Sequence, residues 1–237
     1  MRLKKIMLVS ALAMFSTLTF AQTADEIVNK HIEALGGIEK LESIKSIVSE
    51  RTMSMGGMEI PSKSIVVTGK SMRNESTVMG NTMVQVIHDG KGWMVRPAMM
   101  GGTGEAEDMP MEMFNQQIGQ LDPFGALVKY QEKGNKVTLV GTEKIDKKDN
   151  YHLKIEIPSG IVINEYIDSK TFMVSKITIP SEGPVTEITF EDYIAKSGVK
   201  FPNTMSISSQ MGQITMYTEK IEVNPEIDPK IFEKPTK

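Results

Sequence analysis

The feature that most restricts the fold is a long series of short strand-like runs, which begins at Ile44 and continues nearly to the end of the chain. Residues in these runs alternate with a period of two, and Gly, Pro, Asp and Asn lie between the runs. The predicted strands are 47–55, 58–68, 70–79, 82–88, 93–96, 137–145, 151–157, 161–167, 172–179, 185–194, 199–208 and 214–223. Short strands with hairpin-length connections favour one large antiparallel sheet, curled or closed to bury one face.

Several runs carry apolar residues on both sides. In one of them Val174 opposes Met173 and Ile177. An antiparallel sheet covered on one face only is expected to alternate more cleanly between apolar and polar residues. Either helices cover the second face or that face lines a cavity.

One segment, residues 98–130, interrupts the strands. It begins with AMMGGTGEAEDM, which we interpret as a flexible loop, and two short helices are predicted to follow. Asp108 and Pro110 would open the first helix, because proline at the first helical position costs no hydrogen bond. Asp122 and Pro123 would open the second. Apolar residues then recur at helical spacing: Met111, Phe114, Ile118, Phe124, Leu127 and Val128. The segment is interpreted as a lid over an apolar site or, alternatively, as two helices packed on the sheet.

Residues 1–21 resemble a secretory signal peptide. They have a basic start, a long apolar run and small residues before Ala21. Their removal takes away three Lys/Arg and no acid, so the formal charge falls from −3 to −6. Residues 22–237 contain no linker or repeat and are predicted to form a single domain.

The mature chain is predicted to begin with a helix from Thr23 to Leu35. Thr23 and Glu26 have the spacing of a capping box, and Gly36 with Gly37 ends the helix.

Charge and composition exclude several functions. Nucleic-acid binding requires a clustered basic face, which this acidic chain lacks. The absence of cysteine excludes disulfides, thiol catalysis, cysteine-based metal sites and an acylated N-terminal cysteine. We therefore expect a protein that is not lipid-anchored.

Catalysis has little support in the sequence. His31, His88 and His152 occur singly, without the spacing of a metal-binding motif. The acidic residues of the Gly-rich loop, such as Glu105 and Glu107, are interpreted as a solvated surface. No catalytic residue, metal ligand or cofactor is predicted, and an enzyme is the least favoured interpretation.

Methionine is unusually frequent, with 19 residues in the full sequence. Flexible thioether side chains fill irregular gaps and recur on surfaces that adapt to varied apolar ligands. The alternative is a core in which methionine replaces leucine.

Two stretches carry a resemblance to a known family. The first is VIHDGKGWMVRP, from Val86 to Pro97, and the second is the tail, with GVKFP from Gly198, then NPEID and IFEKP. They resemble the LolA/LolB superfamily of lipoprotein carriers of the Gram-negative cell envelope. The first is similar to that family's strand, hairpin and return strand before the lid, and the second to its last strands.

This resemblance implies a mainly β, α+β fold: an incomplete antiparallel barrel with an N-terminal helix and a central helical lid over an apolar cavity. It implies a soluble, monomeric periplasmic carrier for acyl chains of lipoproteins or other lipids. An inner-membrane release complex and an outer-membrane receptor are the implied partners. Carriers of this family hold the lid with an arginine beside a proline. Here the matching stretch is GKSMRNE, which departs from the family pattern because it has no Arg-Pro pair; Arg73 within it and Arg51 on the first strand are the candidates.

The predicted cargo-binding residues are apolar residues expected around the cavity mouth: Met53, Met55, Trp93, Met99, Met100, Met111, Phe114, Ile118, Phe124 and Leu127. Ordinary core packing is the alternative for each. A carrier is the preferred function, and a non-catalytic envelope binding or scaffold protein on the same fold is the alternative.

Overall fold

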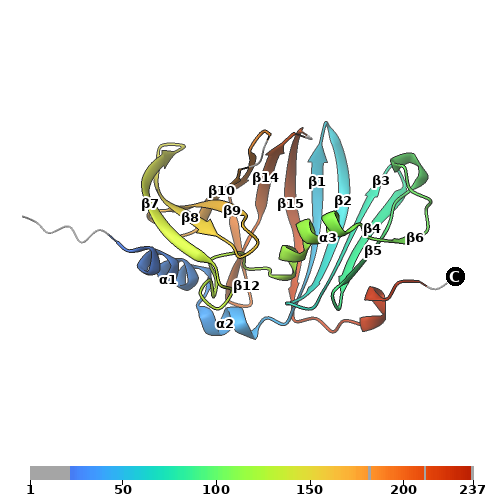
Figure 1. Ribbon diagram of the computed structural model, residues 1–237, viewed down its shortest axis with the longest axis horizontal. Coiled ribbons are helices and arrows are strands. Elements are labelled where there is room, and N and C mark those ends of the chain that lie inside the picture. Colours follow the sequence, from blue (N-terminus) through green and yellow to red (C-terminus); the bar gives the residue numbers. More distant parts are fainter. Residues whose placement is uncertain (1–21, 181–182, 211, 236–237) are drawn as a thin grey trace, which may run out of the picture.

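The computed structural model describes residues 22–180, 183–210 and 212–235. It is mainly β, and its centre is one large curved antiparallel sheet that does not close into a barrel (Figure 1). The order of its strands is β6-β5-β4-β3-β2-β1-β15-β14-β11-β10-β9-β8-β7. Neighbours in sequence are mostly neighbours in the sheet, as hairpin-length connections predict. The expected signal peptide lies outside the described residues.

The first half of the sheet consists of β1 (Ser46–Met55), β2 (Met58–Val67), β3 (Ser71–Val78), β4 (Asn81–His88), β5 (Lys91–Val95) and β6 (Ala106–Asp108). The second half consists of β7 (Lys136–Ile145), β8 (Lys148–Glu156), β9 (Val162–Asp168), β10 (Val174–Ile179), β11 (Thr186–Phe190), β14 (Thr204–Ser209) and β15 (Gly212–Val223). The first and last strands, β1 and β15, pair in the middle and join the two halves.

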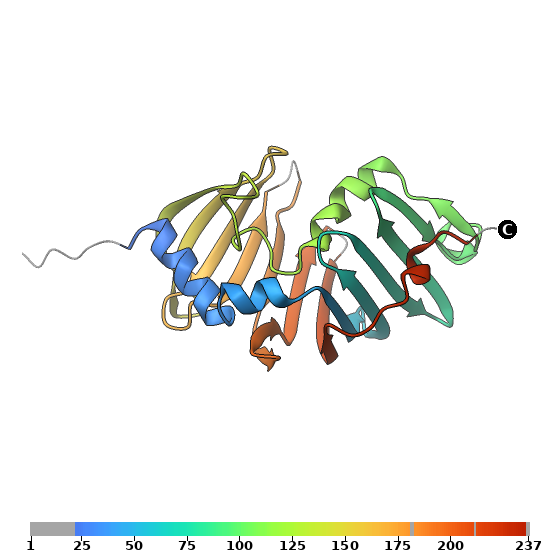
Figure 2. The ribbon, with the colours of Figure 1, turned by 90° about the horizontal axis from the view of Figure 1, so that it is seen from below.

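The helical elements are α1 (Ala24–Leu35), α2 (Ile38–Ser43), α3 (Met111–Gln117) and the 3₁₀ turns η1 (Ala98–Met100), η2 (Ile118–Leu121) and η3 (Pro229–Phe232). Figure 2 shows α1 and α2 along one half of the sheet and α3 over the other. None of the described helices is long and apolar enough to cross a membrane.

Helix α1 begins as the sequence predicts. The Glu26 backbone N–H donates to the Thr23 hydroxyl oxygen at 3.2 Å, and the Thr23 N–H donates to the Glu26 carboxylate at 3.1 Å. These two bonds satisfy N–H groups that no helical carbonyl reaches. The buried side of the helix carries Ile27, Val28 and Leu35.

We expect Thr23→Ala to lower the free energy of unfolding by about 1 kcal/mol, because it removes the N-cap acceptor. Chemical denaturation of the mature protein measures the change. Thr23→Ser keeps an acceptor oxygen and is the matched control. Equal losses in both variants would show that the capping box does not stabilise this helix.

The helices lie on one face of the sheet, called here the inner face. Directly paired residues share a face, so the pairs of Ile47 with Val66 and of Val66 with Met72 place all three side chains together. Met72 packs against Phe114, just after the start of α3. At the far end of the same face, Leu153 packs against α1.

The opposite face, called here the outer face, is covered at the β3–β5 end by the C-terminal segment. Val86 pairs with Trp93 and with Arg73 there, and both valine and tryptophan pack against Phe232. At this end of the sheet, apolar residues therefore lie on both faces because each face has its own cover.

Two expectations about the predicted lid, residues 98–130, are wrong in detail; residues 110–134 are called here the lid segment. Asp108 does not open a helix, because it pairs with Trp93 in the edge strand β6, and α3 follows Pro110. The second predicted helix is a series of turns after Asp122. Gly125 and Lys129 have φ of 74° and 55°, which a right-handed helix does not allow.

Two predicted strands are each divided. The run 185–194 ends at Phe190, and a separate hairpin of β12 (Tyr193–Lys196) and β13 (Val199–Pro202) follows before β14. Tyr193 and Phe201 of this hairpin pack with the core beneath α1 and α2. Burial of these side chains away from the main sheet explains the division. The short helix α2 was not predicted.

Candidate functional site

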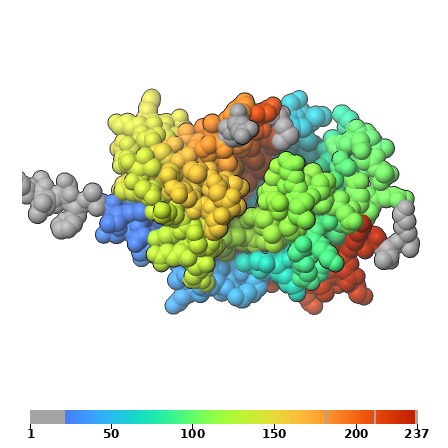
Figure 3. All heavy atoms as spheres, viewed as in Figure 1, coloured from blue at the N-terminus to red at the C-terminus, as the bar shows by residue number. Residues whose placement is uncertain are grey.

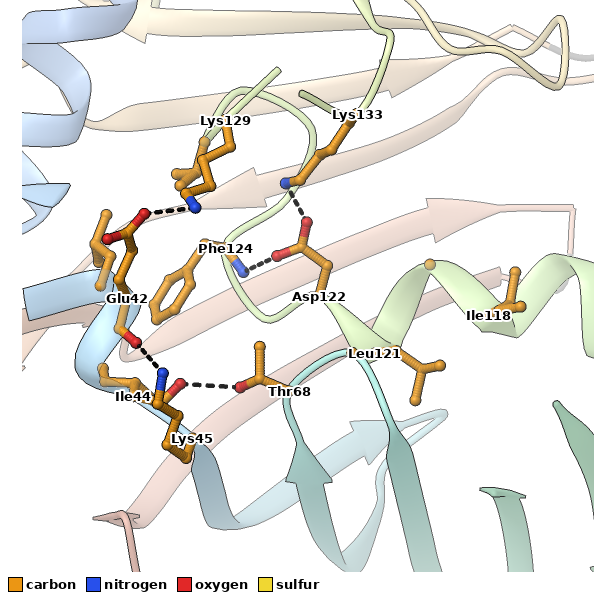
Figure 4. Close-up of a pocket in the computed structure, with 14 residues that line it drawn as sticks. Glu42, Ile44, Lys45, Thr68, Ile118, Leu121, Asp122, Phe124, Lys129 and Lys133 are labelled. Carbon is orange, nitrogen blue, oxygen red and sulfur yellow. Dashed lines mark hydrogen bonds and ion pairs between the residues drawn. The ribbon is translucent and has the colours of Figure 1, made fainter. Parts of the chain in front are cut away.

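One cavity, called here the first cavity, has a volume of about 610 Å³ and lies between α2, the β2–β3 turn and the lid segment (Figure 4). Its apolar lining residues are Leu41, Ile44, Ile118, Leu121, Phe124 and Val128. Charged groups surround this lining: Glu42, Lys45, Asp122, Lys129 and Lys133. The arrangement is an apolar interior with a polar rim, within the volume range of small-molecule sites.

Few contacts connect the lid segment to the rest of the protein at this cavity. The Lys129 ammonium pairs with the Glu42 carboxylate on α2, and this bond raises the pKa of Lys129. The Gly69 N–H donates to the Leu121 carbonyl at 2.8 Å. Lys133 pairs with Asp122 inside the lid segment itself (Figure 4). Exposed ion pairs of this kind contribute little stability, so the lid segment is held mainly by apolar packing, with Leu127 and Val128 buried in the core.

A second cavity of about 390 Å³ lies on the inner face in the middle of the sheet. Its wall contains Met53, Met83, Met205, Met216 and Ile207 beside Ser49, Arg51, Ser62, Ser64, Asn74 and Gln85. Gln120 closes it from the lid segment. Because Ile118, Gly119 and Leu121 line the first cavity and Gln120 the second, the turn η2 separates the two. The green atoms of the lid segment cover this region in the space-filling view (Figure 3).

Cross-strand register brings the methionines together. Met53 pairs with Met216, and Met216 pairs with Met205, so all three point to the inner face. They lie on β1, β15 and β14, and β1 is far in the sequence from the other two. Met53 was among the predicted residues, whereas Met83, Met205 and Met216 were not, because pairing between the ends of the chain is not readable from periodicity.

The structure brings only some predicted cargo-binding residues to the cavities. Ile118 and Phe124 line the first cavity and Met53 the second. Phe114 packs against Met72 between α3 and the sheet, and Leu127 is in the core beneath α1. Four others line neither cavity: Met55 at the end of β1, and the exposed Met99, Met100 and Met111.

Trp93 and Arg73 lie on the outer face, where both line a separate cavity of about 450 Å³ under the C-terminal segment, which corrects their expected places beside the lid. The Trp93 indole N–H donates to the Phe232 carbonyl at 2.8 Å. The Arg73 guanidinium lies 5.7 Å from the centre of the Trp93 ring and donates to the Ile231 carbonyl at 2.8 Å. These contacts hold the C-terminal segment. Arg73 therefore does not hold the lid segment, since alternation along β3 directs its side chain to the other face.

Arg51 has an unusual environment on the inner face. It lines the second cavity, and its Nε atom is buried without a hydrogen-bond partner in the described part of the chain. None of the ion pairs among residues 22–180, 183–210 and 212–235 includes it. Burial lowers the pKa of its guanidinium. No bond from Arg51 to the lid segment is present among these residues.

A third cavity, of about 150 Å³, lies beneath α1 and contains Glu165, His31 and Tyr193 in its wall. Glu165 is only 4% exposed, and burial raises its pKa to about 7, although Lys133 opposes this shift. Burial also lowers the pKa of His31, against a hydrogen bond from its ring to the Phe172 carbonyl at 2.7 Å. Within the described ranges, no group of three His, Asp or Glu residues is placed to hold a metal ion.

The fold and site define a class: an open, curved antiparallel sheet whose inner face is covered by helices and contains apolar cavities. No protein-family model matches the chain, and no curated protein matches its sequence. Solved structures do match. A LolA superfamily protein from Nitrosomonas europaea has a TM-score of 0.61 at 13% identity, over 90% of this chain and 99% of that one.

Two further structures agree in fold. A DUF1329 family protein from Desulfovibrio piger has a TM-score of 0.63 at 12% identity, over 90% of this chain and 98% of that one. A putative outer membrane lipoprotein-sorting protein domain from Vibrio parahaemolyticus has a TM-score of 0.56 at 16% identity, over 88% and 95%. The chain therefore has a LolA-like fold, as its sequence motifs indicate.

Proposed function

We propose that this protein is a periplasmic carrier that shelters acyl chains of lipoproteins or other lipids during transfer to the outer membrane. The first cavity is the observation that supports this most: an apolar space of about 610 Å³ between α2, the β2–β3 turn and the lid segment. The methionine-lined second cavity adds an adaptable surface beside it. The likeness in fold to a lipoprotein-sorting domain is consistent with this role.

The physical requirement for such a carrier is large. Burial of each methylene contributes about 0.8 kcal/mol, so a sixteen-carbon chain exposed to water costs about 12 kcal/mol. A carrier has to replace that water with apolar side chains and later release the chain. Side chains such as Ile118 and Phe124 provide the apolar contact, and the small number of bonds between the lid segment and α2 permits opening.

Replacement of Ile118 by aspartate is expected to reduce acyl binding tenfold or more. Ile118 lines the first cavity yet is 43% exposed, so the variant should fold, while its carboxylate would oppose an apolar chain. The measurement is native mass spectrometry with lipid extraction of mature protein purified without detergent. Titration with a fluorescent acyl probe gives the affinity.

Met111→Asp is the matched control, because Met111 lies on the same lid segment but is 71% exposed and lines neither cavity. It should bind the probe as the wild type does. Bound lipid that is lost only in the Ile118 variant would support the carrier. A wild-type protein that contains no lipid and does not bind the probe would contradict the carrier function and favour the scaffold alternative.

A further inference from the structure

We propose that Arg51 is the binding site for the oxyanion head group of an amphiphile whose chain lies along the methionines of the second cavity. This inference rests on the proposed function and specifies its ligand: an acyl chain that ends in a carboxylate or a phosphate. The ligand would supply the negative charge that the protein itself does not place beside Arg51.

The first support is the missing partner. A buried charge is normally paired or fully hydrogen-bonded, because desolvation is costly. Arg51 faces a cavity, its Nε has no partner among the described residues, and the acids nearby do not pair with it. Glu75 also contributes to the cavity wall, but its carboxylate accepts from Arg73 at 2.6 Å. The guanidinium is therefore free to bind two oxygens of a ligand.

The second support is the composition of the wall around Arg51. Ser49 and Ser62 flank it on the inner face, and the Ser62 hydroxyl donates to the Arg51 carbonyl at 3.2 Å, which leaves Ser49 as the flanking hydroxyl for a ligand. Hydroxyl groups donate hydrogen bonds to oxyanions. The other side of the cavity consists of Met53, Met205 and Met216. A polar end and an apolar end within one cavity of about 390 Å³ fit an amphiphile better than a free inorganic ion.

A path of hydrogen bonds connects this cavity to the lid segment. The Ser64 hydroxyl donates to the Asn74 side-chain oxygen at 2.6 Å, and the Asn74 amide donates to Gln120 at 3.1 Å. Gln120 belongs to η2, the turn between the two cavities. A head group at Arg51 thus lies next to residues that contact the lid segment, and a long chain passes η2 to reach the first cavity.

The test compares three ligands of equal chain length on the mature wild-type protein: dodecanoate, dodecanol and dodecyltrimethylammonium. Displacement of a fluorescent acyl probe gives each affinity. We expect dodecanoate to bind at least tenfold more tightly than dodecanol, and the cation to bind most weakly. Inorganic phosphate is titrated separately and should displace the probe poorly.

Two variants test whether Arg51 causes the preference for dodecanoate over dodecanol. Arg51→Met should reduce dodecanoate affinity tenfold or more and leave dodecanol unchanged. It should also raise the melting temperature without ligand, because an unpaired buried charge is removed. Arg73→Met, on the outer face of the same sheet, should keep the preference for dodecanoate.

The outcomes separate this inference from the proposed function. Equal affinities for dodecanoate and dodecanol in the wild type would overturn the head-group site and leave the carrier standing. If inorganic phosphate binds as tightly as dodecanoate, the ligand of Arg51 is a free anion, and the inference that it is an amphiphile is wrong. Binding of none of the ligands would overturn both. The ligand series uses wild-type protein, so it still tests the head-group site if a variant fails to fold.

Discussion

Replacement of Trp93 by alanine is expected to lower the free energy of unfolding by about 3–5 kcal/mol, the usual cost of removing a buried tryptophan. Trp93 is 6% exposed, and it packs on the outer face with Val86 and Phe232. Its loss also removes the hydrogen bond to the Phe232 carbonyl and the ring beneath the Arg73 guanidinium. The C-terminal segment would keep the bond from Arg73 to the Ile231 carbonyl and the stacking of Phe232 on His88.

Denaturant unfolding followed by circular dichroism measures the stability, and hydrogen exchange of residues 227–232 reports release of the segment. Trp93→Phe keeps most of the ring and loses only the N–H donor, so a smaller loss of about 1 kcal/mol is expected. Acyl-probe binding by folded Trp93→Ala should equal that of the wild type, since both cavities open on the inner face. Reduced binding in the folded variant would place Trp93 at the cargo site after all.

The second large effect is pH-dependent and concerns Glu165. In the native state its pKa is about 7, whereas an ordinary glutamate has a value of 4.5. Between these pH values the native carboxyl group keeps its proton and the unfolded one loses it. The contribution of Glu165 to stability therefore falls as pH rises from about 4.5 to about 7 and is constant above that range. The full difference is about 3 kcal/mol.

Glu165→Gln removes this dependence. The variant should match the wild type below about pH 4.5 and be more stable by up to about 3 kcal/mol above pH 7. His31 changes stability in the opposite direction, because burial lowers its pKa and its protonation destabilises the fold as pH falls. His31 is present in both proteins, so comparison at each pH isolates Glu165.

Urea denaturation from pH 4 to pH 9 measures this difference. The exposed Glu33 on α1 offers a matched control, and Glu33→Gln should change stability by no more than about 0.5 kcal/mol at any pH. If the free energy of unfolding differs between wild type and Glu165→Gln by the same amount at every pH, the pKa of Glu165 is not raised. Water or a base inside the third cavity would then stabilise the ionised carboxylate.

Local patterns in the sequence were sufficient for most secondary structure. The Thr23–Glu26 capping box begins α1, and two-residue periodicity with turn residues between the runs identifies nearly every strand of the sheet. These features depend on neighbours within a few residues, so they are readable without tertiary structure. Apolar residues on both sides of the strands predicted either a helical cover on the second face or a cavity there, and at the β3–β5 end the C-terminal segment covers that face.

The lid segment shows where local patterns were insufficient. Its apolar spacing after Pro123 suits a helix, yet Gly125 and Lys129 adopt positive φ. Those turns place Phe124 beside the first cavity and bury Leu127 beneath α1. Packing of individual side chains against distant elements overrides a weak helical preference in a short segment.

Pairing between β1 and β15 was decided only in the tertiary structure, and the second cavity depends on it. Met53, Met205 and Met216 come together because strands from opposite ends of the chain are neighbours in the sheet. The sequence by itself determined that a curved antiparallel sheet with a helical cover would form. Which face each residue occupies was settled by register and by the covers, since shifting register by one residue exchanges the two faces. That physical fact separates Arg51, facing the second cavity, from Arg73, which holds the C-terminal segment on the other face.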